Sequence, residues 1–258
     1  MNTDIFILAR SASNRLPAKH LREINGNPVI ENLVNRLKKS KKIRKIVVCT
    51  TELPSDDNLV NFLKEKNIEY FRGSDKDILK RLLDAAKYYN TDIIIDVSGD
   101  KIYTDVNYVD KVANILQNED VDFVRGNNSK LKFDPSDHFV HGIIPGGFKV
   151  STLEEICKRK KSDNTEDGYT EFFISENFVK KYYIIPQIDF NITKKFKLDL
   201  DYPEDLDLAQ KLFTYLKDDF HMNDIIKVFS ENPSMVKITE SLLDKWVINY
   251  EKHKNKSN

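Results

Sequence analysis

The segment Ala9–Lys19 gathers three cations and several small polar side chains into one short stretch. Arg10, Arg15 and Lys19 can form charge-assisted hydrogen bonds to phosphate oxygens, and Ser13 and backbone N–H groups can supply neutral donors. Such a loop can hold a polyphosphate, although a solvated basic loop has the same composition. The glycine patterns of the Walker A loop and of the dinucleotide-binding loop are both missing, so a nicotinamide cofactor is not indicated.

Two aspartates follow apolar runs that lie far apart in the sequence. Asp100 comes just after Ile93–Val97, and Asp201 comes just after Phe196–Leu200. If both runs are strands of one parallel sheet, the two carboxylates converge at its C-terminal edge, where they and phosphate oxygens would suit Mg²⁺. A turn aspartate and a helix N-cap ahead of Pro203 also explain the pair, and spacing alone favours the cap for Asp201.

Short apolar runs alternate with helical patterns over the first 125 residues and would position these groups. The expected strands are Ile5–Ala9, Ile46–Cys49, Glu69–Phe71 and Ile93–Val97. One expected helix follows Pro28. Three more are expected at Asp56–Lys66, Asp77–Tyr89 and Val106–Leu116. This alternation predicts an α/β fold, a mostly parallel sheet with helices on both faces, which binds ligands at the C-terminal ends of its strands.

The pattern changes after Phe123. The expected later elements are a strand-like end to His141–Val150, a helix at Ser151–Lys160, strands at Tyr182–Pro186 and Phe196–Leu200, and a helix at Pro203–Lys217. We therefore expect one domain over residues 1–217, with a variable segment at 126–190, and a helical appendage over 218–258.

Composition excludes several classes of protein. The chain has 41 basic and 41 acidic residues, and this balance argues against a broadly basic nucleic-acid binder. Two cysteines, Cys49 and Cys157, cannot build a disulfide framework or a four-cysteine zinc site. No apolar stretch approaches the roughly 18 residues that a membrane span needs. We expect a cytoplasmic protein that contacts neither nucleic acid nor membrane.

The string Ala-Arg-x-x-Ser-x-Arg-Leu-Pro-x-Lys at Ala9–Lys19 resembles the signature of the cytidylyltransferases that activate acidic sugars. That group includes CMP-Kdo synthetases, CMP-sialic acid synthetases and the spore coat polysaccharide protein F family. Similar stretches continue at Asn25–Ile30, Phe71–Arg81, Ser98–Asp100 and Asp201–Leu206. Together the matching motifs cover most of residues 4–215.

The resemblance implies a Rossmann-like nucleotide-diphospho-sugar transferase fold with a helical C-terminal tail. It implies transfer of CMP from CTP to a small acidic sugar or phosphorylated acceptor, with release of pyrophosphate, for surface polysaccharide or glycoconjugate biosynthesis. Mg²⁺ is the implied cofactor, with Asp100 and Asp201 as its ligands, and a homodimer is the implied assembly. The implied catalytic residues are Arg10, Arg15, Lys19 and Asp100. The implied nucleotide-binding residues are Ala9, Arg10, Ser13, Arg15, Lys19, Arg72, Ser74, Gly99 and Asp100.

The chain departs from this family in ways that leave the acceptor open. Asp96 stands where relatives often have arginine, and Lys101–Asp105 replaces their x-Pro-Leu segment. We expect residues 126–190 to mix acceptor contacts with a dimer interface. His141 and Tyr169 are the candidate acceptor-binding residues there, although a satisfied or exposed histidine is the commoner case.

Two other functions remain open from the sequence. A GT-A-type glycosyltransferase would use Asp199-Leu200-Asp201 as an Asp-x-Asp metal motif, but the cationic Ala9–Lys19 loop better suits a free triphosphate. A catalytically degenerate nucleotide-binding or assembly protein is the other alternative, and Asp96 and the altered segment after Asp100 support it.

Overall fold

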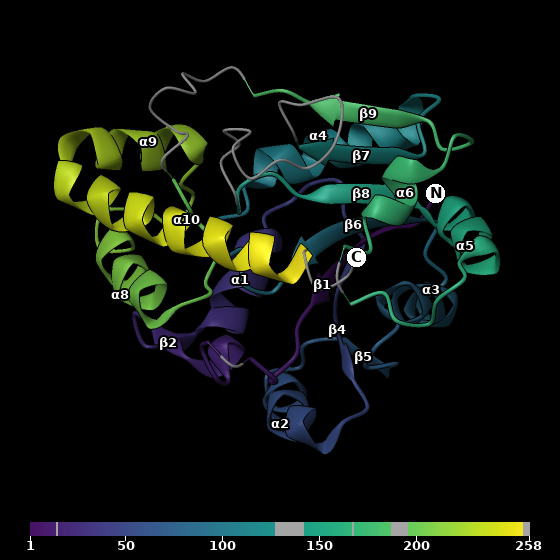
Figure 1. Cartoon of the computed structure of the whole chain (residues 1–258), viewed down its shortest axis with the longest axis horizontal. Helices are drawn as coiled ribbons and strands as arrows, with labels where there is room; N and C mark the ends of the chain where they lie inside the picture. The colour runs from purple at the N-terminus through teal and green to yellow at the C-terminus, as the bar shows by residue number, and fades with distance from the viewer. Residues whose placement is uncertain (14, 127–141, 167, 187–195, 255–258) are drawn as a thin grey trace.

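A seven-stranded sheet lies at the centre of the part of the chain that the structure describes (Figure 1). The computed structural model describes residues 1–13, 15–126, 142–166, 168–186 and 196–254. The strands of this sheet are β1 (Thr3–Leu8), β4 (Lys45–Thr51), β5 (Tyr70–Gly73), β6 (Ile93–Ser98), β7 (Phe123–Gly126), β8 (Gly146–Lys149) and β9 (Lys181–Ile184). Their order is β5-β4-β1-β6-β8-β7-β9. A separate short hairpin joins β2 (Glu23–Ile24) to β3 (Asn27–Pro28).

The sheet is parallel over its first four strands in sequence. Strand β1 pairs in parallel with β4, where Ile5 faces Ile46, and with β6, where Phe6 faces Asp96. Strand β5 extends this arrangement, whereas β8 runs antiparallel to both β6 and β7. Because β1, β4 and β6 run the same way, the loops that follow Leu8, Thr51 and Ser98 leave at one edge of the sheet. The predicted mostly parallel sheet is confirmed.

Helices cover both faces of the sheet (Figure 1). Helices α1 (Val29–Leu37), α2 (Asp57–Glu65) and α4 (Val106–Asn118) share a core with Ile5 and Ile7 of β1. Helices α3 (Ile78–Tyr89), α5 (Val150–Arg159) and α6 (Glu171–Ser175) share the opposite core with Phe6. Alternate side chains of a strand point to opposite faces, so the apolar run in β1 supplies both cores. Short 3₁₀ turns lie at η1 (Lys19–Leu21) and η2 (Pro54–Asp56).

The C-terminal helices pack on the same core as α1. They are α8 (Pro203–Leu212), α9 (Met222–Glu231) and α10 (Pro233–Lys254). Phe220, Met222 and Phe229 belong to the core that contains α1, and α10 lies beside α8 and α9 (Figure 1). The division between residues 1–217 and an appendage over 218–258 stays a prediction.

Phe196–Leu200 is not a strand, contrary to expectation. Only Lys197 makes a β-type bridge, and the Asp199 carbonyl accepts a hydrogen bond from Lys197 Nζ at 2.8 Å rather than from a neighbouring strand. The Leu200 N–H instead donates to the Asp100 carbonyl at 3.1 Å. Asp201 is therefore held at the sheet edge by the backbone hydrogen bond of its neighbour Leu200 and by the cations around its carboxylate.

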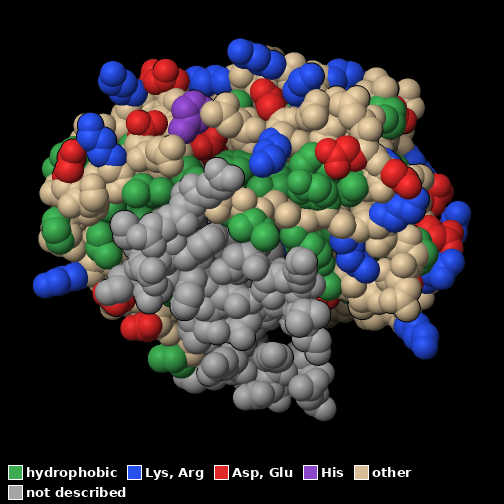
Figure 2. Space-filling model, turned by 90° about the horizontal axis from the view of Figure 1, so that it is seen from above, with side chains coloured by type: hydrophobic (Ala, Val, Ile, Leu, Met, Phe, Trp, Pro, Cys, Tyr) green, Lys and Arg blue, Asp and Glu red, His purple; other side chains and the backbone are tan. Residues whose placement is uncertain are grey.

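The surface mixes charges of both signs. Figure 2 shows lysines, arginines and acidic residues interspersed on one face, with a band of hydrophobic side chains beside the grey atoms. None of the helices in the described ranges has the length and apolar character to cross a bilayer.

Candidate active site

A cavity of about 500 Å³ opens at the C-terminal edge of the parallel strands. Its walls come from the end of β1 and the loop after it, the end of β6, the start of α3, and the segment around Glu166 and Tyr169. The lining residues are Leu8, Ala9, Arg10, Ala12, Ser13, Arg15, Lys19, His20, Ile78, Arg81, Ser98, Asp100, Glu166, Tyr169 and Asp201. The structure thus brings the cationic loop and both aspartates into one cavity.

Asp56 holds the start of the loop in place. Its carboxylate accepts a hydrogen bond from the Ser11 N–H at 2.6 Å, and it also accepts bonds from Thr50 and Thr51 at the end of β4. Burial alone would raise the pKa of Asp56, but these hydrogen bonds outweigh burial and lower it. An ionised Asp56 therefore ties the loop after β1 to the neighbouring strand.

Lys19 joins the two aspartates at the cavity wall. Its Nζ lies 2.5 Å from Asp100 Oδ2 and 3.8 Å from Asp201 Oδ1, and it donates to the Leu200 carbonyl at 3.1 Å. Burial would lower the pKa of Lys19, but the charges of Asp100 and Asp201 outweigh it and raise that pKa. Burial likewise opposes ionisation of Asp100, yet Lys19 holds its pKa well below the usual range. Lys19 and Asp100 are therefore charged near neutral pH, whereas burial and the charges of Asp199 and Asp100 raise the pKa of Asp201.

Arg15 completes this group. Its Nη2 donates to Asp201 Oδ1 at 2.9 Å. The residues predicted to bind triphosphate therefore contact the residues predicted to bind metal. A substrate that brings both phosphate and a divalent cation can replace these contacts. Its phosphate can take the place of a carboxylate beside Arg15 and Lys19, and the metal can take the place of their cationic groups beside the two aspartates.

Lys197 supports Asp201 from the interior. Its side chain is only 1% exposed, and its Nζ lies 3.0 Å from Asp205 Oδ2, 3.1 Å from Asp199 Oδ1 and 3.6 Å from Asp201 Oδ2. Asp205 in turn accepts the backbone N–H groups of Asp201 and Tyr202, both at 2.8 Å. One Asp201 oxygen therefore faces a buried lysine while the other faces the cavity cations.

The ring of Tyr202 lies among cations from three parts of the chain. The Arg15 guanidinium carbon lies 5.3 Å from the ring centroid, and Lys197 Nζ lies 5.6 Å from it. Lys245 of α10 lies closer, with Nζ 4.3 Å from the centroid, and it also pairs with Glu204 at 3.3 Å. These cation–π contacts connect the loop after β1 to the last helix.

Glu166 and Tyr169 form the other side of the cavity. Glu166 makes an ion pair with Arg10, and the Tyr169 hydroxyl donates to Asp96 Oδ2 at 2.6 Å. Burial raises the pKa values of Tyr169 and of Asp96. Asp96, the residue that departs from the family pattern, therefore orients a predicted acceptor-binding residue.

Of the remaining predicted residues, Ala9 and Ser13 line the cavity, and Gly99 lies between the lining residues Ser98 and Asp100. The Gly99 N–H donates to the Leu8 carbonyl at 2.8 Å, and a Cβ at Gly99 would lie 2.8 Å from His20 Cε1. Only glycine fits so close to the His20 ring.

Arg72 and Ser74 are not among the residues that line the cavity. Arg72 donates to the Thr51 carbonyl at 2.9 Å and pairs with Asp57 at 2.8 Å. The Ser74 hydroxyl accepts the Asp77 N–H at 3.1 Å, just before α3. His141 lies outside the described residues.

His20 and Arg81 also line the cavity, although neither was predicted from the sequence as a site residue. Burial lowers the pKa of His20 to about 4, and its Nδ1 lies 3.2 Å from the Gly99 carbonyl oxygen. Arg81 lies on the apolar face of α3, three residues after Ile78 and four before Ala85. A cation on the otherwise apolar face of a predicted helix is the sequence feature that could have identified Arg81 as a site residue.

The two aspartates fit a magnesium ion that also has phosphate ligands. No cluster of three or more His, Cys, Asp or Glu side chains that could hold a metal occurs among the described residues. Asp100 and Asp201 nevertheless approach one shared cation, Lys19. Mg²⁺ is often held by one or two carboxylates together with substrate phosphates, so this pair fits Mg²⁺ with a bound triphosphate.

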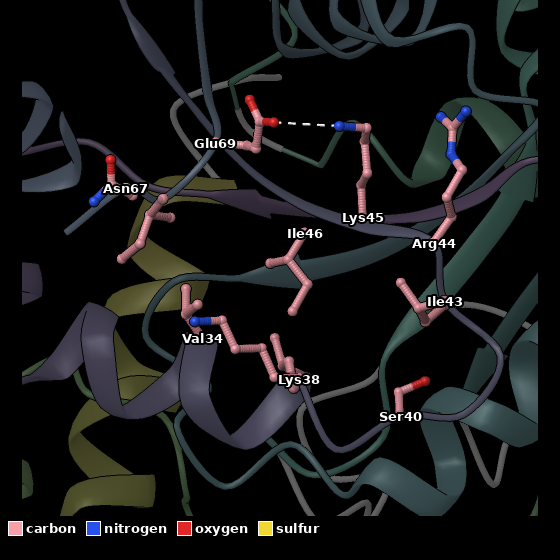
Figure 3. A pocket seen from close by; sticks show the side chains of 11 residues that line it. Val34, Lys38, Ser40, Ile43, Arg44, Lys45, Ile46, Asn67 and Glu69 are labelled. Carbon is pink, nitrogen blue, oxygen red and sulfur yellow. Dashed lines mark hydrogen bonds and ion pairs between the residues drawn. The ribbon is translucent and has the colours of Figure 1, made fainter.

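A second cavity, of about 350 Å³, lies at the opposite end of β4 (Figure 3). Lys45 and Glu69 point toward each other there and pair at 3.2 Å, and the other walls include Val34, Ile43 and Ile46. It contains none of the predicted site residues. The chemistry is therefore concentrated at the C-terminal edge of the sheet.

Fold and site together define a nucleotidyltransferase-type α/β domain. The family model described as cytidylyltransferase matches residues 5–221 of this chain. The chain therefore belongs to the cytidylyltransferase family, whose members are CTP-dependent nucleotidyltransferases.

Individual relatives agree with this assignment. The spore coat polysaccharide biosynthesis protein SpsF of Bacillus subtilis is 22% identical over 241 residues, which span 90% of this chain and 96% of SpsF. The 3-deoxy-manno-octulosonate cytidylyltransferase of Francisella philomiragia is 24% identical over 190 residues, 67% of this chain and 72% of that enzyme. The structure of a cytidylyltransferase from Leptospira borgpetersenii matches with a TM-score of 0.80 and 29% identity, covering 92% of this chain and 97% of the other.

Proposed function

We propose that this protein transfers CMP from CTP to a small acidic sugar and releases pyrophosphate, for the synthesis of a surface polysaccharide or glycoconjugate. The observation that carries the proposal is the meeting of Arg15, Lys19, Asp100 and Asp201 in one cavity. The name of the octulosonate cytidylyltransferase supports an acidic sugar as acceptor, and the name of SpsF supports a role in polysaccharide synthesis.

The residues have separate roles in the proposed reaction. A hydroxyl oxygen of the acceptor attacks the α-phosphorus of CTP, the bond from that phosphorus to the bridging oxygen breaks, and the hydroxyl proton leaves to solvent. Arg10, Arg15 and Lys19 would bind the triphosphate and offset the charge on the departing pyrophosphate. Asp100 and Asp201 would hold Mg²⁺, which when bound would neutralise part of the triphosphate charge. Catalysis of this kind depends on positioning and electrostatics, so no covalent enzyme intermediate is expected.

The proposed acceptor contact lies on the side of the cavity that Tyr169 lines. Tyr169, held by Asp96, is the described candidate for acceptor contact. A phosphorylated acceptor that gives a CDP-linked product is the alternative. The homodimer stays a prediction.

Pyrophosphate release tests the proposal. The protein is incubated with Mg²⁺, each of the four nucleoside triphosphates, and Kdo, a sialic acid or a simple sugar phosphate, and the product is identified by mass spectrometry. We expect release with CTP and at least one acceptor, together with a CMP-sugar or a CDP-linked product. A glycosyltransferase would release no pyrophosphate, and a degenerate relative would bind CTP without releasing any.

A further inference from the structure

Arg81 is a buried cation with no ion-pair or hydrogen-bond partner for its side chain in the described part of the chain. Its side chain lines the active-site cavity, yet the residue is only 2% exposed. Within the described ranges no ion pair or hydrogen bond joins its guanidinium to another residue, and its buried Nε has no hydrogen-bond acceptor. Burying a charged group without a partner is costly, so such a group calls for an explanation.

The nearby acids are already engaged by other groups. Asp56 and Glu166 are the carboxylates whose charges act on Arg81. Asp56 accepts bonds from Ser11, Thr50 and Thr51, and Glu166 pairs with Arg10. Neither carboxylate forms an ion pair with Arg81.

A second buried arginine shows what a structural role looks like. Arg36 is 5% exposed, but it donates to the carbonyls of Thr104 and Phe220, each at 2.7 Å, and stacks 3.5 Å from the Phe220 ring centroid. Arg36 therefore fastens the C-terminal segment to the core. Arg81 makes no comparable set of contacts.

The local structure makes room for the Arg81 side chain. A Cβ added at Gly73, at the end of β5, would lie 3.0 Å from Arg81 Cγ. The stem of Arg81 therefore packs on a strand that has glycine at the contact. Arg10, whose charge acts on Arg81, lines the same cavity.

We infer that Arg81 binds an oxyanion of the substrates in this cavity, a phosphate of the nucleotide. A guanidinium presents paired N–H donors that match phosphate oxygens. The guanidinium N–H groups of Arg81 would then find hydrogen-bond acceptors only when the ligand is bound. The inference rests on the proposed function for the identity of the ligands.

The test compares two buried arginines in the full-length protein. Arg81→Met and its control Arg36→Met are purified, and calorimetry measures binding of pyrophosphate, CTP, CMP and cytidine, while thermal melts measure stability. We expect Arg81→Met to weaken at least one oxyanionic ligand about tenfold or more, as for loss of a charge-assisted hydrogen bond, and to leave cytidine unchanged. Its melting temperature should be unchanged or higher, because an unpaired buried charge is gone. Arg36→Met should lose stability without a selective loss of oxyanion binding.

Two results would overturn the inference. One is Arg81→Met binding all four ligands as the wild type does, and the other is an equal loss of affinity for cytidine, which has no oxyanion. If Arg81→Met does not fold, Arg81→Lys decides: it keeps the charge but loses the paired donors, so unchanged affinity for the phosphate ligands would count against the inference.

The outcome is separable from that of the proposed function. Pyrophosphate binding is measured without turnover. If no nucleoside triphosphate yields pyrophosphate but Arg81→Met still loses pyrophosphate affinity, cytidylyl transfer fails and the role of Arg81 stands. If the wild type turns over CTP and Arg81→Met binds every ligand normally, only the role of Arg81 fails.

Discussion

The backbone N–H of Leu200 donates to the carbonyl of Asp100 at 3.1 Å. This bond joins two segments from distant parts of the chain, and it places Asp201 beside Asp100 without a continuous strand between them. Lys19 then contacts both carboxylates. The proposed metal site therefore depends on one backbone contact and a shared cation.

Asp100→Asn removes one of the proposed metal-binding carboxylates while keeping its shape. We expect kcat to fall by about a hundredfold or more, as for loss of a preorganised electrostatic group, with a much smaller change in CTP affinity. Steady-state kinetics and calorimetry measure the two effects. Near-normal turnover would remove Asp100 from the metal site.

Arg15→Met removes a cation that contacts Asp201 on the cavity side. Because Arg15 is partly exposed, we expect CTP binding to weaken by about fivefold, close to 1 kcal/mol, with little loss of stability. Calorimetric titration with CTP measures this change. Unchanged affinity would place Arg15 outside the triphosphate site.

Lys197→Met leaves several buried carboxylates without their central cation. We expect a loss of about 3–5 kcal/mol in the free energy of unfolding, because breaking one side of a buried ion pair exposes uncompensated charge to a low dielectric. The double variant Lys197→Met/Asp205→Asn should recover part of that loss, since it removes a carboxylate as well. Urea denaturation of the two variants checks the order, and a double variant less stable than the single one would contradict it.

His20 makes stability depend on pH. Its pKa in the folded protein is about 4, below the usual value of about 6.5 because of burial, so the unfolded chain binds the proton more readily. The contribution of neutral His20 to the free energy of unfolding is therefore fully present above about pH 6.5. This contribution, about 3 kcal/mol, is lost as the pH falls toward 4. His20→Asn, which can still donate to the Gly99 carbonyl, should flatten this part of the curve. Equal slopes for wild type and variant between pH 4 and 6.5 would contradict the assignment.

Much of the fold followed from the sequence because its strands are short apolar runs, such as Ile93–Val97, that only a doubly covered sheet can bury. Arg15, Lys19 and Asp100 were identifiable because each follows or flanks such a run. The position of Asp201 was expected for the wrong structural reason, since a backbone bond to Asp100 replaces the predicted strand.

Other parts of the site depend on contacts that spacing does not encode. The pairing of Arg10 with Glu166 joins segments far apart in sequence. Among the described residues neither Asp56 nor Glu166 pairs with Arg81, because other groups engage both carboxylates, and no local sequence pattern indicates this.

Tyr202 connects the beginning and the end of the described chain. Its ring is contacted by Arg15 from the first loop and by Lys245 from α10, and it follows Asp201 directly. A truncation that removed α10 would therefore disturb more than a peripheral helix: it would free one side of the aromatic wall against which the proposed phosphate-binding arginine rests. The loop that contains Arg15 and helix α10 are therefore coupled through the Tyr202 ring. Removing either segment is expected to change the surroundings of the other.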